Sequence, residues 1–129
     1  MLSKDPDAVL QTLRKLALAL PQAAERLSHG SPGFYIEKGK FFAYFSHNHH
    51  GDGDTAVCVK TSGKDEQDML IEAAPEIYSW PAYIGPSGWI AIDLGGEVDW
   101  NLVEARLLSS YRLVAPRRLR KVRAKVKKF

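Results

Sequence analysis

Residues 34–60, "FYIEKGKFFAYFSHNHHGDGDTAVCVK", contain three apolar runs separated by turn residues, and this pattern predicts the central part of the fold. Aromatic and β-branched residues, which favour strands, are frequent in these runs. The first break is at Gly39, between two lysines, and glycine permits a tight turn there. The second break contains Asp52-Gly53, a strong signal for a hairpin turn. The stretch therefore predicts three consecutive strands.

Helical patterns flank these strands on both sides. Asp5 followed by Pro6 is typical of a helix start, and apolar residues then recur at helical spacing until Pro21. A second helix, "KDEQDMLIEAA", is expected after Ser62 as its cap, and a third, "WNLVEARLLSSY", after Asp99. The run "GWIAIDL" between them predicts a further strand, and the irregular, Pro-broken segment "SWPAYIGPS" precedes it. The expected order of elements is α-β-β-β-α-β-β-α-α, with five strands. Strands in runs with separate helices favour an α+β fold, with two layers, an antiparallel five-stranded sheet and helices on one face.

The length of 129 residues fits a single folded core. We expect residues 1–115 to form one α+β domain and residues 116–129 to form a basic C-terminal helix or tail. The core should include alternating apolar side chains of the strands. They are Phe42 or Phe41, Val57, Val59, Ile90 and Ile92.

The cysteine content and the hydropathy of the chain indicate its cellular compartment. Cys58 is the single cysteine, so an internal disulfide is excluded, and it lies in an apolar run where it should pack as a small hydrophobe. The first ten residues carry acids where a signal peptide would carry bases, and no apolar run approaches the roughly 18 residues of a membrane span. We expect a cytoplasmic protein that does not associate with membranes.

Five segments of the sequence resemble the MmcQ/YjbR family, in the same order and at familiar distances. They are "LALALPQAAERLSHGSPGFYIEKGKFFAYF", "NHHGDG", "PAYIGPSGWIAIDL", "DW" and "SYRLVAPRRL", and they cover about residues 15–119. The resemblance implies a two-layer α+β fold similar to that of secretion chaperones. It also implies a DNA-binding label, which the family carries by structural analogy.

The charge of the chain changes sign along its length. Up to Ala105 there are eight Lys plus Arg against all fifteen Asp plus Glu, whereas residues 106–129 hold ten bases and no acid. An acidic body with a basic end is typical of a domain that contacts nucleic acid through one element. A solvated basic tail would give the same composition.

The C-terminal segment has helical periodicity. Pro116 is expected to open a last helix, in which Leu119, Val122, Val126 and Phe129 form one apolar stripe and the other faces are basic. Such a helix would contact phosphates without reading bases. The candidate nucleic-acid-binding residues are Arg112, Arg117, Arg118, Arg120, Lys121, Arg123 and Lys125.

The histidine-rich loop within the opening stretch could bind a metal, face a ligand, or simply form a hairpin tip. A calcium loop would need a carboxylate at the position of Val59. A zinc site could use His47 and His49 from one strand face, but His29 is the only other histidine outside the loop. A hairpin tip is the leading interpretation, and we predict no metal or cofactor. The ligand candidates in this loop and the later aromatic segment are His49, His50, Asp52, Tyr83 and Trp89.

These patterns favour a binding protein over an enzyme. The segment "GPSGW" lacks the second glycine of a nucleophile elbow, and we predict no catalytic residue. The leading hypothesis is low-specificity DNA binding through the basic C-terminal helix. The alternative is a module that binds a protein or a small-molecule ligand through the aromatic and histidine region.

Overall fold

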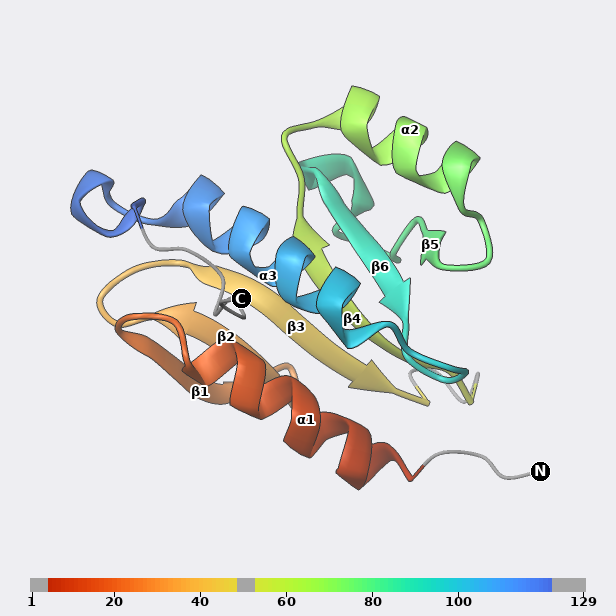
Figure 1. The fold of residues 1–129 in the computed structure, drawn as a ribbon, viewed down its shortest axis with the longest axis horizontal. Coiled ribbons are helices and arrows are strands. Elements are labelled where there is room, and N and C mark those ends of the chain that lie inside the picture. Colours follow the sequence, from red (N-terminus) through yellow and green to blue (C-terminus); the bar gives the residue numbers. More distant parts are fainter. Residues whose placement is uncertain (1–4, 49–52, 122–129) are drawn as a thin grey trace, which may run out of the picture.

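The computed structural model describes residues 5–48 and 53–121, and its described part contains three α-helices and six strands (Figure 1). The helices are α1 (Pro6–Leu18), α2 (Lys64–Ala73) and α3 (Trp100–Val114), with short 3-10 helices η2 (Gly85–Ser87) and η3 (Arg117–Leu119). The strands are β1 (Ala23–Ser28), β2 (Ser31–Ile36), β3 (Phe41–His47), β4 (Thr55–Lys60), β5 (Tyr78–Ser79) and β6 (Trp89–Asp93). All pairings are antiparallel, in the order β1-β2-β3-β4-β6-β5. The predicted α+β fold is confirmed.

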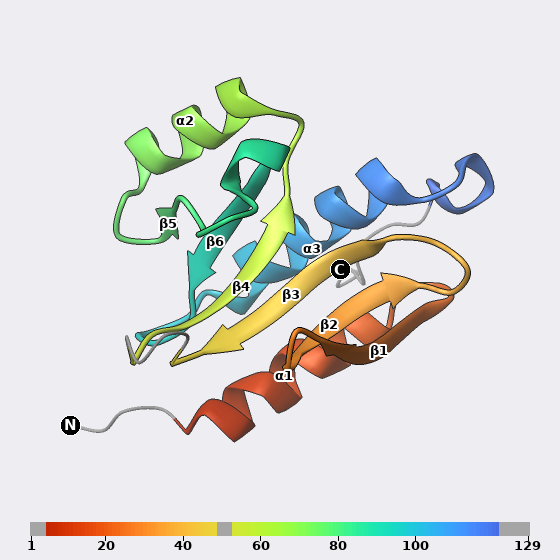
Figure 2. The same ribbon diagram turned by 180° about the vertical axis from the view of Figure 1, so that it is seen from behind.

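The helices α1 and α3 lie on one face of the sheet, and the view from behind shows strands in front of them (Figures 1 and 2). α2 packs beside β5 at the far edge of the sheet. The core between the layers includes the predicted side chains Val57, Val59, Ile90 and Ile92, all with at most 1% exposure. Of the two phenylalanines that the sequence left open, Phe42 is the core residue. Among the described helices, none is long and apolar enough to cross a membrane.

The sheet has six strands instead of the five expected, because the chain forms β1 directly after α1. β1 and β2 are joined at His29 and Gly30, which both have positive φ values of 53° and 84°. Two such residues form the tight turn that matches the twist of a hairpin. Arg14 of α1 donates two hydrogen bonds to the Glu25 carboxylate, at 2.6 and 2.7 Å, and so ties β1 to the helical layer.

The helix ends are partly as predicted. The side chains of Asp5 and Asp99 cap α1 and α3 by accepting hydrogen bonds from backbone N–H groups. Ser62 does not cap α2: the N-cap is Gly63, whose φ of 146° favours glycine. The Glu66 carboxylate instead accepts a hydrogen bond of 2.8 Å from the Ser62 N–H.

The predicted helix from Pro116 does not begin as an α-helix. The described chain continues only as the 3-10 helix η3 and a turn at Arg120 and Lys121. Pro116 itself is extended, with a ψ of 156°, so α3 ends before it. The remainder of the predicted helix, with Val122, Val126 and Phe129, lies outside the described residues.

Candidate nucleic-acid interface

Basic side chains from separate parts of the chain meet at one end of the sheet. The turn between β2 and β3 carries Lys38 and Lys40, and α3 runs toward the same end (Figure 1). Arg118 donates to the Gln22 side chain at 3.5 Å, and the Gln22 carbonyl accepts from the Glu37 N–H at 2.8 Å. These contacts place η3 beside the β2–β3 turn. We call the exposed bases here the basic end: Lys38, Lys40, Arg112, Arg117, Arg118, Arg120 and Lys121.

The segment that follows α3 is held in place by buried contacts. The Tyr111 ring is fully buried and meets Phe42 edge-on at 5.4 Å, while its hydroxyl donates to the Pro21 carbonyl at 2.7 Å. Burial raises the pKa of Tyr111, and the charge of the nearby Arg118 acts in the opposite direction. Arg120 donates from Nε to the Ala115 carbonyl at 2.8 Å. The arginines are therefore presented from an ordered backbone.

Five of the seven predicted nucleic-acid residues fall at this end. Arg123 and Lys125 lie outside the described residues. Sequence reasoning treated Lys38 and Lys40 only as flanks of a turn, so it missed them. Two lysines around a turn glycine were a usable signal, because such a turn exposes both side chains to solvent.

Several carboxylates lie at the opposite end of the sheet, which we call the acidic end. α1 begins there with Asp5 and Asp7, and β4 begins there directly after Asp54 (Figure 1). β6 ends there at Asp93, and the loop that follows contains Glu97. Most of the bases and these carboxylates therefore lie at opposite ends of the strands, although the exposed Glu37 shares the turn of Lys38 and Lys40. Such a separation would orient an anionic polymer toward the basic end.

A buried hydroxyl fixes the strand ends beside the basic end. Ser110 of α3 donates to the Phe42 carbonyl at 2.6 Å and accepts from the Lys60 N–H at 2.9 Å. The backbone pairing of β3 with β4 ends at Ala43 and Val59. The hydroxyl therefore takes the place of the next hydrogen bonds between these two strands.

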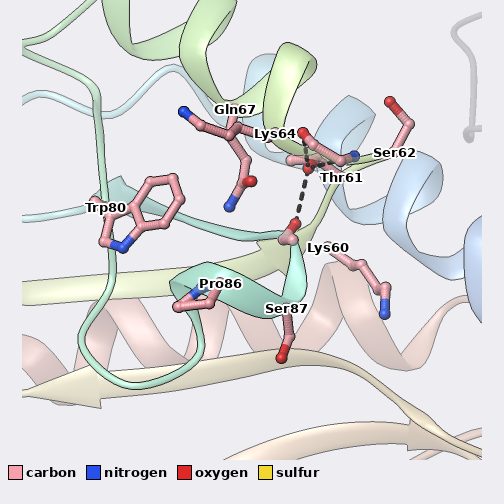
Figure 3. Close-up of a pocket in the computed structure, with 10 residues that line it drawn as sticks. Lys60, Thr61, Ser62, Lys64, Gln67, Trp80, Pro86 and Ser87 are labelled. Atoms are coloured by element: carbon pink, nitrogen blue, oxygen red, sulfur yellow. Dashed lines mark hydrogen bonds between the residues drawn. The ribbon is translucent and has the colours of Figure 1, made fainter.

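A pocket of about 480 Å³ lies where β4 leads into α2 (Figure 3). Two buried side chains hold its walls together. Thr61 donates to the Gly88 carbonyl at 2.7 Å, and Gln67 donates to the carbonyls of Gly85 and Trp89 at 2.8 and 2.7 Å. Trp80 lies against Gly85, where an added Cβ would clash with the indole nitrogen.

The chemistry of this pocket is mildly cationic. Lys60 and Lys64 line it together with Trp80, and the Lys64 ammonium is 5.9 Å from the centre of the Trp80 ring. Lys64 also forms an exposed ion pair with Asp68 at 2.7 Å. A small ligand with an aromatic part and a negative charge would suit these side chains.

The structure separates the predicted ligand candidates. Tyr83 is 81% exposed on the loop before η2, whereas Trp89 is 8% exposed at the start of β6. Trp89 pairs with Lys60 at one end of β4, and His47 pairs with Thr55 at the other end. The described flank of the histidine loop is therefore not beside Trp89. His49, His50 and Asp52 lie outside the described residues.

The flanks of the histidine loop form the predicted antiparallel hairpin. The Asn48 N–H donates to the Asp54 carbonyl, and the Asn48 side chain accepts from the Gly53 N–H, both at 2.7 Å. His47 Nδ1 lies 2.7 Å from the Thr55 hydroxyl. Within residues 5–48 and 53–121, no group of three His, Cys, Asp or Glu side chains is arranged to hold a metal ion.

The fold and the charge distribution define a small two-layer α+β domain with an open antiparallel sheet and one basic end. The family model named YjbR matches residues 18–113, and the chain belongs to this family, as its sequence motifs predicted. A search of curated proteins found no match.

The structure is similar to the crystal structure of Deinococcus radiodurans protein DR2400, which carries the family-model domain DUF419. The TM-score is 0.68 at 21% sequence identity, and the alignment covers 87% of this chain and 85% of that one. At this identity the similarity shows a shared fold and nothing about function.

Proposed function

We propose that this protein binds nucleic acid with low sequence specificity through the basic end. The observation that carries the proposal is the convergence of lysines from the β2–β3 turn with arginines from the segment after α3. These positions are far apart in sequence, and several carboxylates lie at the opposite end of the sheet, although the exposed Glu37 lies within the turn of the basic end. A concentrated positive surface of this kind binds phosphates and releases their counterions.

Low specificity follows from the backbone that carries these bases. They project from a turn, the last turn of α3 and a 3-10 helix of three residues. Base sequence is usually read by a helix or a strand pair inserted into a groove. Short irregular segments are better suited to contacting the phosphate backbone.

The proposal is tested by fluorescence anisotropy with two labelled 20-base-pair duplexes of unrelated sequence. At about 150 mM salt we expect dissociation constants between about 10⁻⁴ and 10⁻⁶ M, similar for both sequences, and tighter binding at 50 mM salt. At 50 mM salt, Lys40→Gln should weaken binding about tenfold. Each phosphate contact contributes about 0.9 to the slope of log binding constant against log salt, and 50 mM lies about 1.3 decades below 1 M, so losing one contact lowers the logarithm by about 1.2.

Lys64→Gln is the matched control, since it removes the same charge from an exposed lysine outside the basic end. It should leave affinity nearly unchanged. Equal losses in the two variants would show that net charge alone matters, and absence of binding at 50 mM salt would refute the proposal.

The pocket beside α2 supports a second candidate, the binding of a small anionic aromatic ligand. The supporting observation is that Thr61 and Gln67 hold its walls together through buried hydrogen bonds to backbone carbonyls. Nucleoside monophosphates are suitable probes for thermal-shift measurements, because a ligand that binds the folded state raises its melting temperature. A shift that disappears in Trp80→Ala would support this candidate, and no shift at millimolar probe would exclude nucleotides.

A further inference from the structure

Four aromatic rings form a continuous row on the sheet face opposite α1 and α3. Figure 2 shows the backbone of the sheet from this face. Successive ring centroids are 5.4 Å apart from Tyr35 to Phe41, 5.0 Å from Phe41 to Tyr44, and 5.0 Å from Tyr44 to Trp89. The row therefore crosses the sheet from β2 over β3 to β6. We call these four residues the aromatic row.

The row is accessible over β2 and β3. Tyr35, Phe41 and Tyr44 are each half-buried, although they face away from the core. Over β4 and β6, Ile84 of the loop before η2 packs against Trp89 and its neighbours. The same loop carries Tyr83, whose ring is exposed and whose φ of 67° is unusual for a residue with a side chain. Aromatic surface is thus available both in the row and at its border.

Glycine at position 33 shapes the row. A Cβ on Gly33 would lie 2.7 Å from the Phe41 ring, so a larger residue would displace that ring from the surface of β2. The Phe41 and Tyr44 planes are inclined by only 24°, which gives a stacked pair. The Phe41 ring is therefore fixed by its contacts with Gly33 and Tyr44.

Cations lie at both ends of the row. The Arg26 guanidinium is 4.6 Å from the centre of the Tyr35 ring and 5.0 Å from that of Phe41. The Lys60 ammonium is 5.9 Å from the centre of the Trp89 ring. Glu25, the neighbour of Arg26, pairs with Arg14 of α1. Asp93 lies at the opposite end of β6 from Trp89. Flat apolar rings between cations complement a chain that alternates flat bases with phosphates.

We propose that the aromatic row binds unpaired bases of single-stranded nucleic acid by stacking, while Arg26 and Lys60 contact the adjacent phosphates. This inference rests on the proposed nucleic-acid binding and specifies the form of the strand. A base stacked on a protein ring contributes about tenfold in affinity, with little dependence on its identity. A duplex keeps its bases paired and stacked inside, so it cannot use the row. The Arg26 guanidinium plane can itself stack on a base.

The test compares a labelled single-stranded 20-mer of thymidine with a 20-base-pair duplex in the same anisotropy assay at 50 mM salt. The wild-type protein should bind the single strand about tenfold more tightly. The double variant Phe41→Leu with Tyr44→Leu should lose about tenfold or more on the single strand and keep its duplex affinity. Met69→Ala, which removes an exposed apolar side chain of α2 outside the row and outside the pocket, is the control and should keep both affinities.

The comparison with Lys40→Gln separates the two proposals. If Lys40→Gln weakens binding of both nucleic acids while the double variant binds the single strand like wild type, the aromatic row is not the site and the basic end stands. If neither nucleic acid binds the wild-type protein, the proposed function itself fails. If gel filtration instead shows a dimer that the double variant abolishes, the row is a contact between copies of the chain and the inference is overturned.

A measurement on the wild-type protein covers the case in which the double variant does not fold. Ultraviolet crosslinking to a 5-bromouracil 20-mer, followed by peptide mass spectrometry, should place crosslinks within residues 33–46. Crosslinks confined to residues 112–121 would overturn the inference and would still support binding at the basic end.

Discussion

Replacing Ser110 by alanine should destabilise the protein well beyond the average effect of losing a hydroxyl. The side chain is fully buried, and it bridges the Phe42 carbonyl and the Lys60 N–H at 2.6 and 2.9 Å. Ser110→Ala leaves two backbone groups without this partner at a place where the strands have already separated. An unsatisfied buried polar group costs about 1–3 kcal/mol, so we expect a loss of about 2 kcal/mol in the free energy of unfolding.

The expected change in melting temperature follows from the size of the chain. At about 2.1 cal/mol/K per residue, a domain of 129 residues has an unfolding entropy near 0.27 kcal/mol/K, so the loss corresponds to about 7 °C. Circular dichroism melts would measure it, with Ser109→Ala, half-buried on the same turn of α3, as the control. If Ser110→Ala melts within about 1 °C of that control, the hydroxyl bonds to the Phe42 carbonyl and the Lys60 N–H do not stabilise the fold.

Three further predictions concern the Glu66 carboxylate, the Cys58 thiol and the arginines within residues 117–120. The Ser62 N–H is the main cause that lowers the pKa of Glu66 from 4.5, so this carboxylate stabilises the fold above about pH 4.5 and loses that contribution as the pH falls further. Glu66→Gln should therefore lower the free energy of unfolding, measured with urea at pH 7, by about 1–2 kcal/mol relative to the exposed control Glu72→Gln. The difference should be much smaller at pH 3, and a difference that does not depend on pH would contradict this. Burial raises the pKa of Cys58 to about 12, so a disulfide reagent at pH 8 should modify it rapidly only after denaturation, and fast labelling of the native protein would contradict its burial. Changing the three arginines within residues 117–120 to alanine should flatten the plot of log binding constant against log salt by up to about 2.7 units for duplex DNA, and an unchanged slope would remove them from the interface.

Local signals in the sequence were sufficient for most of the fold. The two aspartate caps and the three strands of residues 34–60 depend on interactions between near neighbours, which the residue pattern records. β1 has no such signal, since "AAERLS" lacks β-branched residues. It is a strand because β2 pairs with it and because Arg14 binds Glu25, and both causes are tertiary.

The candidate sites were harder to predict than the fold, because they depend on helix paths and strand register that the residue pattern does not record. Composition alone revealed the C-terminal arginines, but the position of Lys38 and Lys40 beside them depends on the paths of α3 and the sheet. The aromatic row depends on register. The pairing of β2 with β3 shifts between Phe34 and Tyr35, and this irregularity places Phe41 in the row while Phe42 enters the core. An alternation rule assumes no such shift, so it left the two phenylalanines undecided.

The basic end and the aromatic row adjoin, so their contributions to nucleic-acid binding can be separated only by what each can contact. Lys40 of the basic end directly precedes Phe41 of the aromatic row, and Lys60 pairs with Trp89 across β4 and β6. Neighbouring strands are about 4.8 Å apart, so a row from β6 to β2 spans about 14 Å, enough for roughly four nucleotides at the 3.4 Å spacing of a stacked strand. Positive charge attracts paired and unpaired strands alike, whereas rings can stack only with bases that have left a duplex. Any preference for single strands must therefore come from the rings, and not from the arginines that dominate the composition of the C-terminal segment.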